Sequence, residues 1–316
     1  MSLSTPVAFI IFNRPDTTER VFETIRQAKP LKLLVVADGP RIDRPGEVEK
    51  CVATRAVIDR VDWECEVITN YSDINLGCKR RPSSGIDWVF SQVEEAIILE
   101  DDCLPTASFF PFCQTLLEYY RHDERISMIA GSNYRKGSSR TAYSYYFSKY
   151  AHTWGWATWR RAWKNYDIDM KTWPECKQNN SLQAIFHDLY EQKSWSNLFD
   201  KVYACEIDTC WDYQWLYSCF SQSRLSIEPN LNLISNIGFG ADATHTFVDS
   251  PLANLPTKDI WEIQHPPIVT RNLEAEIYIF NYICGGNDLR SQDRLLTKIK
   301  NRIRPLKQLF NHWLEQ

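Results

Sequence analysis

The chain has 316 residues, of which 44% are hydrophobic and 24% charged, a composition typical of folded globular proteins and not of disordered or fibrous ones. Its formal net charge of −4 argues against a protein that coats nucleic acid, so no nucleic-acid partner is expected. The longest apolar runs, such as residues 7–12, are far shorter than the roughly 20 residues that cross a bilayer, and the first residues do not resemble a signal peptide. We therefore expect a cytoplasmic protein.

The ten cysteines form no Cys-x-x-Cys pair. Cys205 and Cys210 are the nearest two in the sequence, and no second Cys or His pair lies close enough to complete a zinc site. In a chain without an export signal, cysteines are usually reduced and packed in the interior. We expect free thiols with no catalytic role.

The first 130 residues alternate short apolar runs with longer segments of helical spacing, which predicts an α/β fold with a mostly parallel central sheet flanked by helices. The predicted strands are residues 7–12, 33–37, 66–69, 96–99 and 127–130. The predicted helices are residues 17–27, 46–61, 84–92 and 109–120. Asp16 is the expected N-cap of the first helix.

Charged residues follow three of the predicted strands. Arg14 comes after the first and Asp38 after the second, and an acidic triplet, Glu100-Asp101-Asp102, ends the fourth. Ligands of open α/β sheets bind at the carboxyl ends of the strands, so we expect these side chains to share one crevice.

The acidic triplet is electrostatically costly unless a cation or hydrogen bonds compensate it. Carboxylates that share a metal with phosphate oxygens suit Mg²⁺ or Mn²⁺ better than zinc. The alternative is that Asp101 or Asp102 caps the helix that follows Pro105.

The second half of the chain is rich in Ser, Tyr and Trp, and no Pro/Gly-rich linker separates it from the first. The last segment, 286–316, has apolar residues at helical spacing among Lys and Arg residues, which predicts a basic amphipathic helical tail interrupted by Pro305. Two interpretations stay open: the tail packs on the body of the protein, or residues 289–313 contact an anionic membrane.

The order of several motifs resembles that of GT-A fold glycosyltransferases. The motifs are Asn13-Arg14-Pro15, Asp38-Gly39-Pro40, Asn75-x-Gly77, Glu100-Asp101-Asp102, Gly131-Ser132-Asn133, Trp154-Gly155-Trp156, Trp211-Asp212, Ile227-Glu228-Pro229 and Gly238-Phe239-Gly240. The chain is similar to the N-acetylglucosaminyltransferase I family and to bacterial family-2-like glycosyltransferases over roughly residues 6–245. Each motif is common on its own. Their shared order makes the resemblance specific.

The resemblance implies a single GT-A domain over residues 1–285, with a nucleotide-sugar-binding half at about 1–130 and an acceptor and catalytic half at 131–285. The residues expected to bind the nucleotide sugar are Arg14, Asp38, Arg81, Glu100 and Asp101. Asp102 is the expected ligand of Mn²⁺ or Mg²⁺. Lys79 and Arg80 precede Arg81, and a solvated surface run is the alternative for two of these three.

Asp212 is the expected general base, because inverting transfer needs a carboxylate to take the proton of the acceptor hydroxyl. The similar family has two adjacent acids here, whereas this chain has Tyr213 after Asp212. Glu206 and Asp208 lie close in the sequence and are the main rivals for the role. His245 is a candidate second metal ligand, and a buried or capping histidine is its alternative.

Trp154 and Trp156 are expected to contact the acceptor, because aromatic rings stack on the apolar faces of sugars. Core packing is the alternative for both. The resemblance implies a metal-dependent inverting glycosyltransferase, with a nucleotide-diphosphate sugar, in particular a UDP-sugar, as donor. The acceptor would be a glycan or lipid-linked glycan in surface polysaccharide synthesis at the inner face of the membrane.

Two other functions stay open. A nucleotidyltransferase or sugar-nucleotide pyrophosphorylase shares the α/β layout, but the first strand lacks the Gly-rich loop that holds a triphosphate. A non-catalytic glycan-binding module on a transferase-like fold is the second alternative, because fold alone does not determine function.

Overall fold

The computed structural model describes residues 2–135, 141–239 and 250–294. The expected metal ligand His245 lies outside these ranges, and so does the expected tail beyond Arg294. Within the described ranges, no helix combines the length and the apolar character needed to cross a bilayer.

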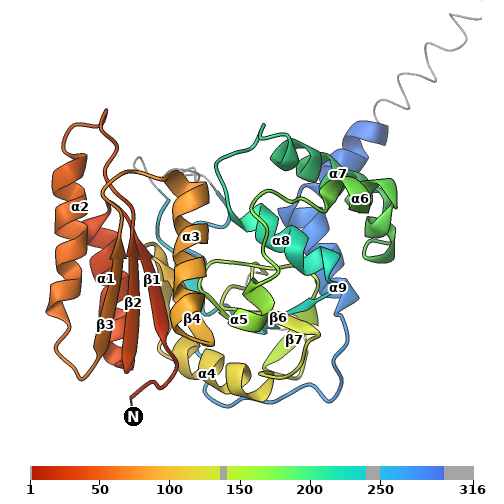
Figure 1. The fold of residues 1–316 in the computed structure, drawn as a ribbon. Coiled ribbons are helices and arrows are strands. Elements are labelled where there is room, and N and C mark those ends of the chain that lie inside the picture. Colours follow the sequence, from red (N-terminus) through yellow and green to blue (C-terminus); the bar gives the residue numbers. More distant parts are fainter. Residues whose placement is uncertain (1, 136–140, 240–249, 295–316) are drawn as a thin grey trace, which may run out of the picture.

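An eight-stranded sheet forms the centre of the protein, in the order β3-β2-β1-β4-β8-β6-β9-β7 (Figure 1). Its strands are β1 (Val7–Ile11), β2 (Lys32–Ala37), β3 (Glu66–Tyr71), β4 (Glu95–Glu100), β6 (Ile126–Ala130), β7 (Tyr145–Ser148), β8 (Trp156–Trp159) and β9 (Leu225–Pro229). The pairings among β3, β2, β1 and β4 are parallel, as is that of β6 with β9. β8 is antiparallel to both of its neighbours, and β7 is antiparallel to β9. The predicted α/β class with a mostly parallel sheet is confirmed.

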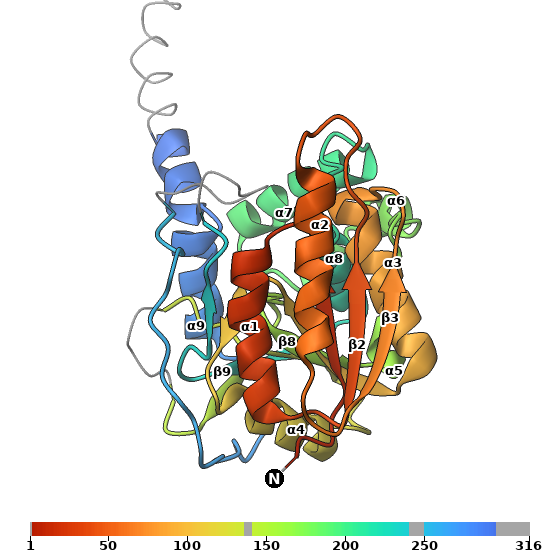
Figure 2. The ribbon, with the colours of Figure 1, turned by 90° about the vertical axis from the view of Figure 1, so that its left-hand side faces the viewer.

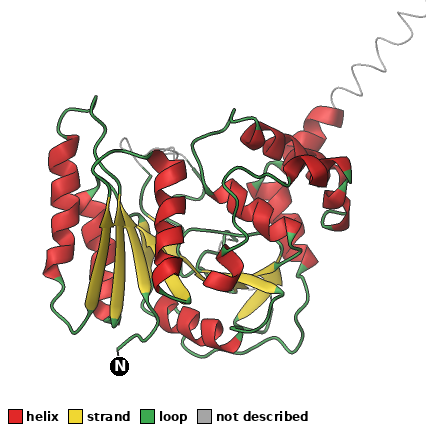
Figure 3. Ribbon diagram, in the orientation of Figure 1, coloured by secondary structure: helices red, strands yellow, loops and turns green. Residues whose placement is uncertain are grey.

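Helices cover both faces of the sheet (Figure 3). The helices of the first half are α1 (Pro15–Ala28), α2 (Glu47–Ala56), α3 (Gly77–Gln92) and α4 (Phe109–Tyr119). Those of the second half are α5 (Arg160–Trp163), α6 (Trp173–Gln178), α7 (Leu189–Tyr203), α8 (Asp212–Ser221) and α9 (Leu273–Tyr278). Short 3₁₀ turns lie at Val57–Arg60 and Ser181–Ala184, and a π turn at Ile279–Ile283 continues α9.

The alternation of side chains along β1 divides the core into two layers. Val7, Phe9 and Ile11 pack with residues of α1 and α4. Ala8 and Ile10 pack with residues of α3, α5 and α8 on the other face. α1 and α2 lie side by side on the first of these faces (Figure 2). A further aromatic cluster joins α6, α7, α8 and α9.

Two helix starts differ from the prediction. α1 begins at Pro15, and its N-cap residue is Arg14, which makes no side-chain cap bond. The prediction of Asp16 as N-cap is therefore wrong: a proline suits the first helical position, and Asp16 lies in the first turn. α3 begins at Gly77, seven residues before the predicted 84, and contains Pro82 near its start.

A small second sheet pairs β5 (Cys103–Pro105) with β10 (Ile234–Asn236) in an antiparallel arrangement. β5 directly follows the acidic triplet, and β10 comes from late in the chain. This pairing brings residues after Asn236 to the carboxyl end of β4. The halves of the chain also join where β8 pairs with β4 and β6, and where β9 pairs with β6.

Candidate active site

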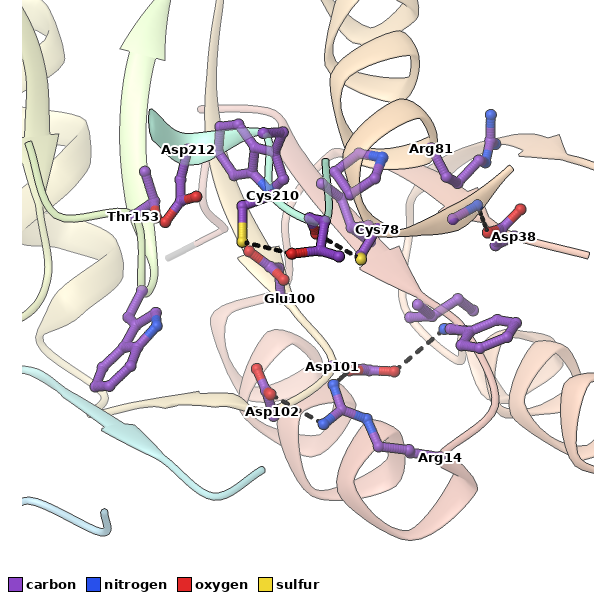
Figure 4. Close-up of a pocket in the computed structure, with 18 of the residues that line it drawn as sticks. Arg14, Asp38, Cys78, Arg81, Glu100, Asp101, Asp102, Thr153, Cys210 and Asp212 are labelled. Atoms are coloured by element: carbon purple, nitrogen blue, oxygen red, sulfur yellow. Dashed lines mark hydrogen bonds and ion pairs between the residues drawn. The ribbon is translucent and has the colours of Figure 1, made fainter. Parts of the chain in front are cut away.

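A cleft of about 310 Å³ lies at the carboxyl ends of β1, β2 and β4. The predicted site residues that line it are Arg14, Asp38, Arg81, Glu100, Asp101, Asp102, Trp154 and Asp212. Asp38 lies at one end of the cleft and Asp212 at the other, with Glu100 between them (Figure 4). The parallel strands thus bring together the charged residues that follow them, as predicted.

Arg14 pairs with two carboxylates of the acidic triplet. Its guanidinium donates to Asp101 and, at 3.0 Å, to Asp102 Oδ2 (Figure 4). Asp101 is 3% exposed and also accepts from the backbone N–H of Phe12 at 3.1 Å. Burial alone lowers the pKa of Arg14, but the two carboxylates outweigh burial and raise this pKa above its ordinary value. The end of the first strand therefore neutralises part of the charge at the end of the fourth.

Glu100, the last residue of β4, has no such partner in Arg14. Burial, followed by the charges of Asp102 and Asp101, raises the pKa of Glu100 to about 8. Burial also raises the pKa of Asp101, against the opposing effect of Arg14. The triplet thus remains short of positive charge, and a cationic ligand in the cleft would relieve this.

The segment after β10 closes one side of the acidic triplet. The backbone N–H of Ile237 donates to the carbonyl of Asp102 at 2.8 Å, and Asn236 Oδ1 accepts from the N–H of Gly238 at 2.9 Å. A Cβ atom at Gly238 would lie 2.8 Å from both Asp102 Cβ and Arg14 Nη1. Only glycine allows this close approach. Asn236 was not predicted, although the nearby Gly238-Phe239-Gly240 motif marked this region.

The carboxylate of Asp38 accepts hydrogen bonds from groups of the protein itself. It accepts from the backbone N–H groups of Gly39, Leu76 and Gly77 at 2.9–3.0 Å and from the Asn75 side chain at 3.0 Å. Burial raises its pKa in spite of these bonds. The carboxylate therefore fixes the loop before α3, and its predicted contact with a nucleotide sugar stays a prediction.

Arg81 is 6% exposed and ties two strand ends together. Its guanidinium donates to the carbonyl of Ala37 at 3.1 Å and to the side chain of Asn70 at 2.8 Å. Lys79 pairs with Asp208 at 2.5 Å on the surface. The described contacts of Arg81 are structural, so its predicted role in binding a nucleotide sugar gains no support from them.

Asp212 begins α8 and accepts from the N–H of Tyr213 at 3.1 Å. Its side chain points into the cleft beside Thr153 (Figure 4). The rivals for its role lie elsewhere: Asp208 has a side chain 61% exposed and Glu206 is also exposed, and neither lines the cleft. Among these three acids, only Asp212 can meet a ligand that fills the cleft.

Two cysteines that were expected only to pack in the interior line the cleft: Cys210 lies beside Glu100 and Asp212, and Cys78 lies on the side of Asp38 (Figure 4). Cys78 Sγ contacts the carbonyl of Thr209 at 2.6 Å, and Cys210 Sγ lies 3.7 Å from Thr209 Oγ1 (Figure 4). Burial and nearby carboxylates raise the pKa of Cys210 to about 11, so its thiol stays protonated at neutral pH. All ten cysteines are free thiols in the structure.

The two predicted acceptor tryptophans have different positions. Trp154 lines the cleft, and the rings of Tyr134 and Phe239 pack edge-on against its ring. The distances between ring centroids are 5.3 Å to Tyr134 and 5.9 Å to Phe239. Trp156 is 0% exposed and packs against Trp211 and Trp215 in the core. The prediction that Trp156 contacts an acceptor is wrong, because a fully buried ring has no face left for a sugar.

The donor atoms at the acidic triplet fit a divalent cation that prefers oxygen. Mn²⁺ and Mg²⁺ take few protein carboxylates and share their other positions with phosphate oxygens and water. Within the described ranges, no group of three or more His, Cys, Asp or Glu side chains is arranged to hold a metal by itself. A metal here would therefore depend on oxygen atoms from a bound ligand.

Comparisons with known proteins bring no further identification. No protein-family model matches the chain, and no curated protein matches it either.

Proposed function

We propose that this protein is a metal-dependent inverting glycosyltransferase of the GT-A type, which moves a sugar from a UDP-sugar to a hydroxyl of a glycan or lipid-linked glycan. The observation that supports this most is the composition of the cleft. An arginine-paired acidic triplet from the first half of the chain lies across from Asp212, which comes from the second half. The order of sequence motifs supports the same assignment.

In this proposal the two ends of the cleft have different tasks. Asp212 takes the proton of the acceptor hydroxyl as that oxygen attacks the anomeric carbon from the face opposite the diphosphate. Arg14 lies where its guanidinium can turn from Asp102 to the oxygens of the leaving diphosphate. Asp102 would hold Mn²⁺ or Mg²⁺, whose contribution is to offset the charge on that diphosphate.

Trp154 lines the cleft and would stack against a sugar ring. Its ring is fixed by the edge contacts of Tyr134 and Phe239, so little rotamer freedom is lost when a sugar binds. The contact with an anionic membrane through residues 289–313 stays a prediction, because most of that segment, from residue 295 on, lies outside the described ranges.

The test combines binding and turnover. We expect UDP and UDP-sugars to raise the melting temperature with Mn²⁺ and to have little effect with a chelator, because a ligand that binds only the native state stabilises it by mass action. Asp102→Asn should lose the metal-dependent shift. Asp212→Asn should keep the shift but lose at least about 100-fold in the rate of UDP release with acceptor glycans.

Asp208→Asn is the matched control, since Asp208 is an exposed acid four residues before Asp212. It should retain both binding and turnover. Release of pyrophosphate from a nucleoside triphosphate and a sugar phosphate would instead identify a nucleotidyltransferase. Binding of glycans without any response to nucleotides would identify a binding module, and either result would overturn the proposal.

A further inference from the structure

A buried carboxylate outside the predicted site organises the cleft near Asp38. Glu47, the first residue of α2, has a side chain that is 5% exposed. It accepts from the backbone N–H of Arg41 at 2.6 Å and from Arg41 Nε at 2.9 Å. It also accepts from the Asn13 side chain at 2.9 Å. Glu47 therefore ties the loop after β1 to the loop after β2.

These contacts hold the side chain of Arg41 in one orientation. Glu47 accepts hydrogen bonds from Nε and Nη2 of the guanidinium. The guanidinium carbon lies 5.5 Å from the centre of the Phe12 ring. Nη1 makes no hydrogen bond to any residue in the described ranges. Both Arg41 and Phe12 line the cleft. The remaining N–H groups are thus held ready for a ligand, and the side chain loses little entropy when one binds.

Arginine only donates hydrogen bonds, so Nη1 selects ligand atoms that accept them. Under the proposed function, the sugar lies near Asp212 and the diphosphate near the acidic triplet. The nucleoside then extends toward Asp38, three residues before Arg41, at the end of the cleft opposite Asp212 (Figure 4). Bases differ at this kind of contact: uracil, thymine and guanine carry a carbonyl oxygen where cytosine and adenine carry an amino group.

We infer that Arg41, positioned by Glu47, selects donors whose base carries a carbonyl oxygen at the position where cytosine and adenine carry an amino group, and so distinguishes UDP- from CDP-linked sugars. This inference rests on the proposed function, because it takes the direction of the bound nucleotide from it. Phe12 adds an apolar surface beside the guanidinium. An amino group in place of the carbonyl would point its own N–H bonds at those of Arg41, with no acceptor between them.

The experiment measures dissociation constants of UDP, CDP, GDP and ADP by calorimetry, with Mn²⁺ present. We expect the parent protein to bind UDP at least tenfold more tightly than CDP, and GDP more tightly than ADP. Arg41→Met should weaken UDP about tenfold and CDP by less than threefold, so that the preference nearly disappears. Arg44→Met, an exposed residue of the same loop, is the matched control and should keep the preference.

Glu47→Gln separates positioning from folding. It keeps the shape of the side chain but weakens its hold on Arg41, so the preference for UDP over CDP should fall while the variant stays folded at the temperature of the binding assay, which its melting temperature checks. Equal losses for UDP and CDP in Arg41→Met would mean that Arg41 contacts the phosphates or the ribose, and would overturn the inference alone. Absence of binding by every nucleotide to the parent protein would overturn the proposed function with it.

Discussion

Single buried side chains in this protein often act by holding another residue. Arg14 is paired to Asp101 and Asp102, and Asp38 accepts hydrogen bonds from the backbone at the start of α3. Glu47 does the same for Arg41. Such partnerships are invisible in a sequence, because each joins positions that become neighbours only after the strands have paired. The sequence shows which residues carry charge, and the fold decides which of them face a ligand.

His152 allows a prediction about pH. Its side chain is 11% exposed and packs against the rings of Tyr134 and Tyr150, with Glu228 Oε2 3.8 Å from Nε2. Burial lowers the pKa of His152 from 6.5 to about 3. Between these values the unfolded chain binds a proton that the folded protein does not, so the free energy of unfolding rises with pH there. The slope from this residue is at most about 1.4 kcal/mol per pH unit.

Replacing His152 by Gln should therefore flatten the pH dependence of stability between pH 4 and 6.5, measured by urea denaturation at each pH. His122→Gln changes an exposed histidine and should leave the slope as in the parent. An unchanged slope in His152→Gln would mean that His152 is protonated in the folded state and paired with Glu228.

Among the elements, α9 depends on a buried group of charges that fixes it to the sheet. Glu276 is 2% exposed and accepts from the backbone N–H of Lys149 at 2.8 Å. It also pairs with Arg271 at 2.6 Å and lies 3.8 Å from Lys149 Nζ. Glu191, from α7, completes the group with a 2.8 Å pair to Lys149. The negative charges of Glu276 and Glu191 thus offset the positive charges of Lys149 and Arg271 where α7, α9 and the end of β7 meet.

Glu276→Ala should lower the free energy of unfolding by about 3–5 kcal/mol, because it leaves buried positive charge with one carboxylate fewer. Chemical denaturation measures this loss. Glu274→Ala is the control on the same helix: its side chain is 82% exposed and pairs with Arg135 at 3.7 Å, so its loss should stay below about 1 kcal/mol. Similar losses in both variants would contradict the importance of the buried group.

The elements also show which parts of the fold can be predicted from sequence. Most strands of the first half were recognisable because they contain a short apolar run bounded by polar or turn residues, as in β1 and β4. The strands β5, β7, β8, β9 and β10 were not predicted. They are short, and β8 enters the sheet antiparallel between β4 and β6. Long-range pairing of this kind leaves no local pattern.

The same limit applies to the candidate site. Asp38 and the acidic triplet could be predicted because they lie at the ends of apolar strands, and Asp212 and Trp154 because they stand in recognisable motifs. Trp154 and Trp156 could not be told apart in advance, since only the start of β8 at Trp156 turns the second ring into the core. Arg41 gave no signal, because its position depends on a carboxylate six residues away.

For the molecule as a whole, the two halves share one sheet. β4 pairs with β1 on one side and with β8 on the other, and one core cluster contains residues from Leu3 to Ile260. Neither half can lose its structure without exposing apolar surface of the other. We therefore predict one cooperative unfolding transition.

Pulsed alkylation of thiols across a urea series, read by mass spectrometry, tests this. Cys51 of α2 and Cys219 of α8 are each 2% exposed and report on the two halves, and exposed Cys205 should react without urea. We expect the same midpoint for Cys51 and Cys219. Two separated midpoints would mean that the predicted halves are independent domains.

The pairing of β8 with β4, and of β10 with β5, also affects how the chain folds during its synthesis. A ribosome releases β1 to β4 before residues 156–159 exist, so the nascent sheet has an open edge at β4. The acidic triplet likewise has no contact with Gly238 until that residue has been synthesised. A nascent chain is thus most exposed to wrong strand pairing during this interval, which makes a chaperone most useful before the second half emerges.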